Sequence, residues 1–277
     1  MSGILYVIGT PIGNLQDLSP RAVETLRQID FIAAEDTRVT VKLLNHFEIK
    51  KPMISYFEHN KHIKGEIIIN RILSGEICGL VTDAGMPAIS DPGQELVAQC
   101  AEAGITVLSI PGPTAMTTAL AVSGLPTGRF TFEGFLSMNK KNRMQHLNEL
   151  KSETRTMVFY EAPHKLNATL TDLYAAFGER RIALVREITK IHEETIRTTL
   201  SNAAVLYEET PPKGEFVLVI EGTPPTKQTE SFTLDDAVKK ANALIKSGEK
   251  AASAAKIAAA ETGIKKSEIY KIIADKE

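Results

Sequence analysis

Three loops rich in glycine and proline have the composition of a ligand-binding site. They are Gly9–Asn14, Asp83–Gly93 and Pro111–Thr114, and each follows a short apolar run. Glycine and proline let the backbone approach a flat ligand closely. Few cationic side chains occur in these loops, so the pattern favours a nucleoside or a sulfonium-bearing ligand over a phosphate-rich one. Chance clustering of turn residues is the alternative.

The elements that would position these loops alternate along the first 115 residues. Such alternation is typical of βαβ units with a parallel sheet, and open sheets of this kind bind ligands outside the carboxyl ends of their strands. The predicted strands are Leu5–Gly9, Phe31–Glu35, Ile77–Asp83 and Thr106–Ile110, and the predicted helices are Ser19–Gln28, Val39–Asn45, Lys64–Ser74 and Gln94–Ala103.

Strand-like runs dominate from about residue 130, which predicts a second α/β domain with a mixed sheet. The strands expected there are Phe130–Leu136, Thr156–Glu161, Arg181–Glu187, Thr195–Leu200 and Glu215–Glu221, with helices at Asn142–Lys151 and His164–Phe177. We expect domains at residues 1–122 and 123–222, then a linker at Gly222–Thr229. A helical extension at 230–277 would hold helices Asp235–Ser247, Ala251–Thr262 and Lys266–Ile273, of which the last two resemble a helix-turn-helix.

Composition limits the functional class. The 277 residues carry a formal charge of −2, so no overall positive field marks a nucleic-acid binder. Cys78 and Cys100 form no paired motif, which favours a reduced cytosolic setting. The N-terminus lacks a basic signal-peptide region. Prolines interrupt the charge-free stretch Ala103–Gly128, which predicts a buried strand, a turn and a core helix rather than a membrane span. We therefore expect a cytoplasmic protein without a membrane partner.

Eight motifs, in order and at plausible spacing over residues 3–222, resemble the tetrapyrrole methylase superfamily of S-adenosylmethionine-dependent enzymes. The chain is most similar to its ribosomal RNA branch, the small subunit methyltransferase I family. The motifs are VIGTPIGN (Val7–Asn14), AEDTR (Ala34–Arg38), SYFEHN (Ser55–Asn60), TDAGMPAISDPG (Thr82–Gly93), PGPT (Pro111–Thr114), FYEAPH (Phe159–His164), GERRIALVRE (Gly178–Glu187) with Thr189 and Lys190, and KGE (Lys213–Glu215).

The resemblance implies a two-domain fold with S-adenosylmethionine in a cleft, and 2′-O-methylation of a cytidine in the decoding region of 16S ribosomal RNA. It also implies a homodimer. Tetrapyrrole enzymes carry a GxGPGD-like first loop, and the loop Gly9–Asn14 departs from it, which disfavours a porphyrin substrate. The residues expected at the cofactor are Pro11, Thr82, Asp83, Ala84, Gly85, Ile89, Ser90, Pro111, Thr118, Tyr160, Ala162 and Gly214.

Several of these positions have a structural alternative. The segment at Thr82 could be a capping turn. Thr118 could bond back along its own helix, and Tyr160 could be a buried strand end with a satisfied hydroxyl.

Methyl transfer to a ribose hydroxyl needs in-line alignment and removal of a proton. Two clusters could supply the base: Glu35 and Asp36 with Arg38, and Glu58 with His59. Asp36 and Arg38 could instead form a structural ion pair, and His59 could be a surface residue. The reaction needs no metal, and no histidine pattern predicts one.

RNA would require cations for its phosphates. Lys140, Lys141 and Arg143 follow a predicted strand on a polar segment, so we expect an exposed loop that holds small-subunit RNA; a solvated helix face is the alternative. Two other functions stay open. One is a corrin or porphyrin methylase of the same fold, and the other is a ligand-sensing helix-turn-helix regulator.

Overall fold

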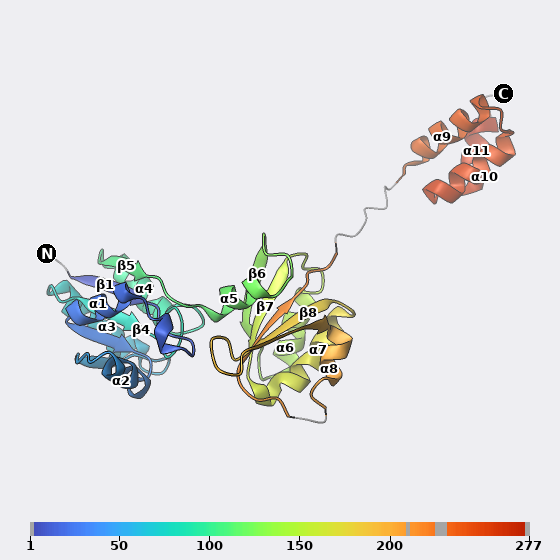
Figure 1. Cartoon of the computed structure of the whole chain (residues 1–277). Helices are drawn as coiled ribbons and strands as arrows, with labels where there is room; N and C mark the ends of the chain where they lie inside the picture. Colours follow the sequence, from blue (N-terminus) through green and yellow to red (C-terminus); the bar gives the residue numbers. More distant parts are fainter. Residues whose placement is uncertain (1–2, 209–210, 225–231, 275–277) are drawn as a thin grey trace. The chain divides into compact units, whose positions relative to one another are not determined.

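The computed structural model describes residues 3–208, 211–224 and 232–274 and divides into two compact units (Figure 1). The first unit is Met1–Thr223 and contains two five-stranded sheets. The second is Pro224–Glu277 and contains three helices.

The first sheet is entirely parallel, with strand order β3-β2-β4-β1-β5. Its strands are β1 (Ile4–Ile8), β2 (Phe31–Ala34), β3 (Met53–Ser55), β4 (Cys78–Val81) and β5 (Thr106–Ile110). All their carboxyl ends therefore lie at one edge. The expected fold class is confirmed, but β5 is an edge strand with Leu108 42% exposed, where a buried strand was expected.

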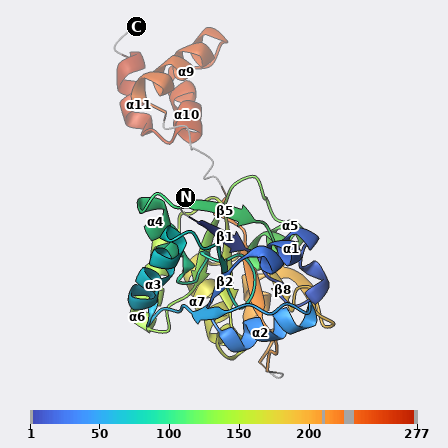
Figure 2. The ribbon, with the colours of Figure 1, turned by 90° about the vertical axis from the view of Figure 1, so that its left-hand side faces the viewer.

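Helices cover both faces of this sheet (Figure 2). One face packs against α3 (Lys61–Leu73) and α4 (Gly93–Glu102), through residues such as Ile68 and Leu96. The other packs against α1 (Pro20–Gln28) and α2 (Thr37–His46), through Leu26 and Leu44. A short 3-10 helix, η1 (Leu15–Asp17), precedes α1.

Helix starts in this sheet follow the capping chemistry of the sequence. Ser19 accepts a hydrogen bond from Ala22 N, and Pro20 takes the first helical position, where a missing N–H costs nothing. The Asp36 side chain caps α2 by accepting from Arg38 N, so that helix begins two residues before the predicted start.

The second sheet is mixed, with order β6-β7-β10-β8-β9. Only β6 and β7 are parallel neighbours; the other pairs are antiparallel. The strands are β6 (Phe130–Phe135), β7 (Thr156–Glu161), β8 (Arg181–Arg186), β9 (Glu194–Thr199) and β10 (Phe216–Ile220). One face packs against α6 (Lys140–Glu149), α7 (Leu166–Phe177) and α8 (Leu200–Val205), and the 3-10 helix η2 (Pro163–Lys165) leads into α7.

The other face of the second sheet is covered by α5 (Ala115–Val122). Ala119 and Leu120 lie buried against Val158, Val217 and Val219. The helix expected to close the first domain thus packs with the second. By its packing, α5 groups with the second sheet rather than with the first.

The second unit consists of α9 (Leu234–Lys246), α10 (Ala251–Thr262) and α11 (Lys266–Ala274) around a small alanine-rich core. A capping box between Thr233 and Asp236 starts α9, and Gly263 ends α10 with a left-handed φ of 72°. The three predicted helices lie where the sequence placed them. Of the predicted linker Gly222–Thr229, residues 225–229 lie outside the described residues.

Both cysteines are fully buried in the first sheet and its helices, Cys78 on β4 and Cys100 on α4. Burial raises the pKa of both thiols, that of Cys100 to about 11. Within the described ranges, no helix is both long and apolar enough to cross a bilayer.

Candidate functional site

A cavity of about 430 Å³ opens at the carboxyl edge of the first sheet and is closed by the second. A volume of this order suits a drug-sized ligand or cofactor. Its lining comes from both sheets: Ile12, Glu35, Thr82, Asp83, Ala84, Gly85, Met86, Ile89, Ser90, Asp91, Thr114, Ala115, Met116, Phe135, Tyr160, Glu161, Ala162, Ile188, Lys190, Glu215, Phe216 and Val217.

The loop after β4 is fastened to the end of β1 by Thr10. Thr10 and Gly85 exchange both backbone hydrogen bonds, at 2.9 and 3.1 Å. The buried Thr10 hydroxyl donates to the Thr82 carbonyl at 3.1 Å. The base of the cavity is therefore a hydrogen-bonded join between two strand ends.

The loops after β1 and β5 touch through two glycines. A Cβ added at Gly9 would lie 2.6 Å from the Gly112 Cα, and one at Gly112 would lie 2.8 Å from the Gly9 Cα. Only glycine allows this approach. Gly9 and Gly112 thus bring the two backbones together and do not themselves line the cavity. The neighbouring residues Ile12, Thr114 and Ala115 line it.

Four residues other than glycine adopt left-handed backbone in the two loops that face each other across the cavity. They are Ala88 and Ser90 (φ 69° and 63°) and Glu187 and Thr189 (φ 51° and 66°). This conformation costs free energy and persists where surrounding contacts enforce it, commonly at functional sites.

The first of these two loops is held by Asp91. One oxygen of Asp91, Oδ1, accepts from Ala88 N and Gly93 N at 2.9 and 2.7 Å. The other, Oδ2, is buried without a partner among the described residues. Burial raises the pKa of this carboxyl.

The second loop is held by an ion-pair network. Lys190 Nζ lies 2.9 Å from Glu187 Oε1 and 3.0 Å from Glu215 Oε2. Glu187 also accepts from Glu215 N at 3.0 Å. Gly214 leaves room for this carboxylate, since a Cβ there would lie 2.5 Å from the Glu187 Cγ.

Glu35 links the ends of β2 and β4 and faces the cavity. Its Oε2 accepts from the Thr82 hydroxyl at 2.5 Å and from Asp83 N at 3.4 Å. No hydrogen bond engages its Oε1 within the described part of the chain. Burial, and then the neighbouring Glu35, raise the pKa of Asp83, so the two carboxylates form an electronegative corner.

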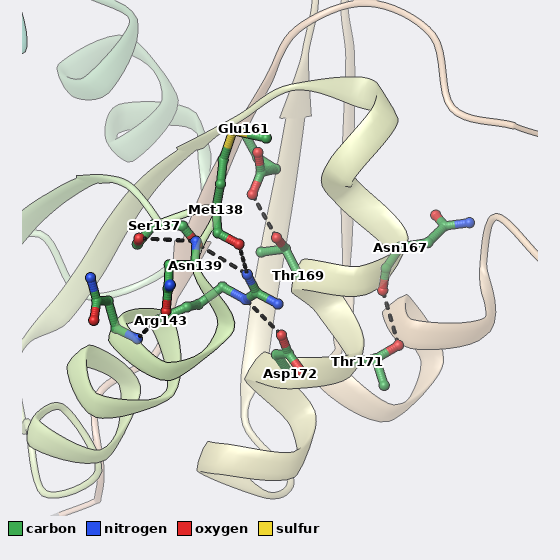
Figure 3. Close-up of polar contacts among 10 residues, drawn as sticks. Ser137, Met138, Asn139, Arg143, Glu161, Asn167, Thr169, Thr171 and Asp172 are labelled. Atoms are coloured by element: carbon green, nitrogen blue, oxygen red, sulfur yellow. Dashed lines mark hydrogen bonds and ion pairs between the residues drawn. The ribbon is translucent and has the colours of Figure 1, made fainter.

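The charged lining as a whole is anionic. It contains the carboxylates of Glu35, Asp83, Asp91, Glu161 and Glu215, against the single cation Lys190. Glu161 is 3% exposed, and one of its oxygens accepts from Ala162 N. The other accepts from the Thr169 hydroxyl (Figure 3). Such a cavity favours a ligand that carries positive charge and disfavours phosphate.

Eight of the twelve expected cofactor residues line the cavity: Thr82, Asp83, Ala84, Gly85, Ile89, Ser90, Tyr160 and Ala162. Pro11, Pro111, Thr118 and Gly214 do not. Thr118 instead donates its hydroxyl to the Thr114 carbonyl at 2.8 Å, the structural alternative expected for it. Tyr160 combines both roles, because its ring lines the cavity and its hydroxyl accepts from Met116 N at 3.1 Å.

Of the five residues in the two clusters considered for catalysis, four lie outside the cavity lining: Asp36, Arg38, Glu58 and His59. Asp36 is the cap of α2, and its ion pair with Arg38 at 2.6 Å lowers its pKa to about 2, which makes it a weak base. Glu58 pairs with Lys61 at 2.9 Å, and His59 meets Phe57 edge-on in the turn before α3. Of the two clusters, only Glu35 reaches the cavity.

The three cations expected to hold RNA separate into two kinds. Lys140 and Lys141 are exposed in the first turn of α6. Arg143 is turned inward, with its side chain 16% exposed: it pairs with Asp172 at 2.7 Å and donates to the carbonyls of Ser137 and Met138 at 3.0 and 3.2 Å. Arg143 therefore anchors the loop, and this geometry does not favour the expected contact of its side chain with phosphate.

Sequence reasoning missed the apolar part of the wall, namely Met86, Met116, Phe135, Ile188, Phe216 and Val217. Ile188 follows the GERRIALVRE motif and Phe216 follows KGE, so proximity to a motif could have suggested both. No local signal marks Phe135. Across the described ranges, no three histidine, cysteine or carboxylate side chains gather as metal ligands.

Comparison with known proteins identifies the family of this chain. Residues 4–204 match the family described as Tetrapyrrole (Corrin/Porphyrin) Methylases. "Ribosomal RNA small subunit methyltransferase I" of Synechocystis sp. is 49% identical over 98% of this chain and 97% of its own length. The protein of that name from Thermotoga maritima is 46% identical over 79% of this chain and 99% of its own.

Among solved structures, a uroporphyrin-III C-methyltransferase from Thermus thermophilus, complexed with S-adenosylhomocysteine, has the same fold. Its TM-score is 0.55 at 17% identity, covering 79% of this chain and 97% of that one. The chain therefore belongs to the tetrapyrrole methylase family and, within it, to the family of ribosomal RNA small subunit methyltransferase I proteins.

Proposed function

We propose that the chain transfers a methyl group from S-adenosylmethionine to the 2′ hydroxyl of a cytidine in the decoding region of 16S ribosomal RNA. The observation that carries the proposal is the anionic cavity at the carboxyl edge of the first sheet. The two relatives named for ribosomal RNA are 49% and 46% identical to this chain, whereas the porphyrin enzyme is 17% identical. This difference favours RNA over a tetrapyrrole.

The cavity fits this cofactor in size and charge. S-adenosylmethionine carries positive charge on its sulfonium and ammonium groups, and carboxylates outnumber cations in the lining. The apolar side chains of Met116, Ile188 and Val217 suit the uncharged adenosine part. When bound, the cofactor supplies an electrophilic methyl group. The loop residues Thr82–Gly85 and Ser90 would hold it through backbone and hydroxyl groups.

Glu35 is the proton acceptor that we assign to the reaction. Its Oε1 has no hydrogen-bond partner among the residues that the structure describes, while hydrogen bonds from Thr82 and Asp83 fix its Oε2. A carboxylate held in this way can accept the ribose proton as the oxygen attacks. In-line alignment of the reactants by the two walls of the cavity supplies the larger share of the barrier lowering, about 7–11 kcal/mol in well-oriented systems.

Lys140 and Lys141 would hold the phosphates of the substrate. They lie exposed at a helix N-terminus, where backbone N–H groups also favour anions. Cations in a first turn oppose the helix dipole, so a bound anion would offset their unfavourable placement.

The purified chain with S-adenosylmethionine should add one ribose methyl group to small-subunit RNA, located by mass mapping on a cytidine of the decoding region. Ala84→Leu, which fills the cavity, should abolish both this methylation and cofactor binding by calorimetry. Ala101→Leu, on the exposed side of α4, is the matched control. Methylation of a base, or unchanged cofactor affinity in Ala84→Leu, would contradict the proposal.

Glu35→Gln should lower turnover by roughly 10²–10⁴-fold, the usual contribution of a general base. The amide oxygen can still accept from the Thr82 hydroxyl, so cofactor affinity should stay close to that of the parent chain. Glu58→Gln, in the turn before α3, should leave turnover unchanged. Single-turnover rates with saturating RNA measure the loss of turnover. A Glu35→Gln enzyme with the rate of the parent chain would show that Glu35 is not the proton acceptor.

Replacing Lys140 and Lys141 together with alanine should reduce the slope of log K for RNA against log salt by about 1.5 units. Arg143→Ala should act differently, because it releases the loop and its partner Asp172. Its melting temperature should fall by roughly 3–10 °C. A double-lysine variant with the parental slope would argue against phosphate contacts there.

We also infer a cytoplasmic homodimer, as the family resemblance implies. The edge strand β5 supports it, because among the described residues its outer backbone has no strand partner and Leu108 is exposed. Light scattering should return twice the chain mass of 30.3 kDa at micromolar concentration. A mass of one chain would refute the dimer.

A further inference from the structure

We propose that Phe135 and Ile89 form a nucleobase-binding subsite at the mouth of the cavity, which stacks the base of the target nucleotide. The inference rests on the RNA substrate proposed above and adds to it the contacts that would bind the target base. Both side chains line the cavity, yet Phe135 is 57% exposed and Ile89 is 49% exposed. Large apolar groups half exposed at a cavity mouth mark a binding surface.

A β-bulge turns the Phe135 ring toward the cavity. Along β6, Phe132 pairs with Val158, but Gly134 pairs with Phe159 and Phe135 with Tyr160, so Glu133 is an extra residue. In a regular strand, residues 132 and 135 would face opposite sides. The bulge brings both rings to Tyr160, edge-on, with centroids at 4.9 and 5.5 Å. Bulges commonly redirect side chains at functional sites.

Gly134 makes this bulge possible and joins it to the facing loop. Its φ of 64° lies in the left-handed region, and a Cβ there would lie 3.5 Å from Ser90 Oγ. The bulge and the Ala88–Asp91 loop therefore lie next to each other. Ile89 sits between two left-handed residues, Ala88 and Ser90, so the backbone that directs it is strained.

Both sides of the subsite are fixed before a ligand arrives. Asp91 holds the Ile89 loop through Ala88 N and Gly93 N. Arg143 holds the segment after Phe135 through the carbonyls of Ser137 and Met138, as Figure 3 shows. Tyr160 supports the Phe135 ring from behind, and its own hydroxyl is held by Met116 N. Such preorganisation lowers the entropy lost on binding.

The negative charge of the cavity favours entry of the base and ribose of the nucleotide over entry of its phosphate. Carboxylates dominate the lining, so a phosphate would be repelled. The base and ribose are uncharged, and a base extruded from RNA is commonly held between aromatic and apolar side chains. A base stacked on Phe135 would carry its ribose toward Glu35 and the cofactor loops, which line the same cavity.

Kinetics with Phe135 variants test the subsite. Phe135→Ala should raise KM for small-subunit RNA by roughly 5- to 100-fold, as expected for loss of one stacking contact. Its kcat should change by less than about threefold, since stacking contributes mainly uniform binding. Cofactor affinity by calorimetry should stay unchanged, and Phe135→Tyr should restore KM. Phe130→Ala is the matched control, because Phe130 lies on the same strand outside the cavity lining.

A second measurement does not depend on methyl transfer. A short RNA of the decoding region, with a fluorescent cytosine analogue at the target position, should change its emission on binding the parent chain, and this change should disappear with Phe135→Ala or Ile89→Ala. Thermal unfolding establishes that each variant is folded. Loss of cofactor affinity in Phe135→Ala would assign the ring to the cofactor and overturn the subsite, as would an unchanged KM and emission. Absence of ribose methylation by the parent chain would refute the proposed function alone.

Discussion

The join between Thr10 and Gly85 is the constraint on which the rest of the site depends. Two backbone hydrogen bonds and a buried hydroxyl tie the loop after β4 to the end of β1. The join fixes the start of the loop from Asp83 to Gly93, and Asp91 holds its far end through Ala88 N and Gly93 N. With this join, Asp83, Ser90 and Asp91 are held over the sheet edge, and the second sheet can close the cavity above them. Ala88 and Ser90 keep their left-handed backbone in the turn that Asp91 holds.

Local chemistry made much of the fold and part of the site predictable. Alternating apolar runs predicted the parallel sheet, because such strands are buried on both faces. Ser19 and Gly263 marked helix ends through capping chemistry that acts within a few residues. The strand-end loops were found because glycine and proline are needed wherever backbone turns sharply beside a ligand. Positions such as Thr82 and Ala84 thus follow from the sequence alone.

What the sequence could not reveal depends on contacts between distant segments. Arg143 reads as a surface cation until Asp172, 29 residues further on, is seen to pair with it. The apolar α5 could cover either sheet, and only the fold assigns it to the second. In an ideal strand, the Phe135 side chain would point away from the cavity. A bulge turns it toward the cavity, and this bulge depends on Gly134 and on a register shift against β7. Patterns of fixed period do not contain such shifts.

The two buried cysteines have a practical consequence for watching this molecule move. Cys78 lies on β4, the strand that carries the cavity loop, and Cys100 lies on the helix behind it. Both thiols are buried and burial raises their pKa, so a thiol reagent cannot reach a reactive thiolate in the folded state. Labelling then proceeds only during rare openings of the first sheet, and its rate counts those openings. Thiol labelling of the two native cysteines therefore reports local opening of the half of the molecule that carries the cavity loop.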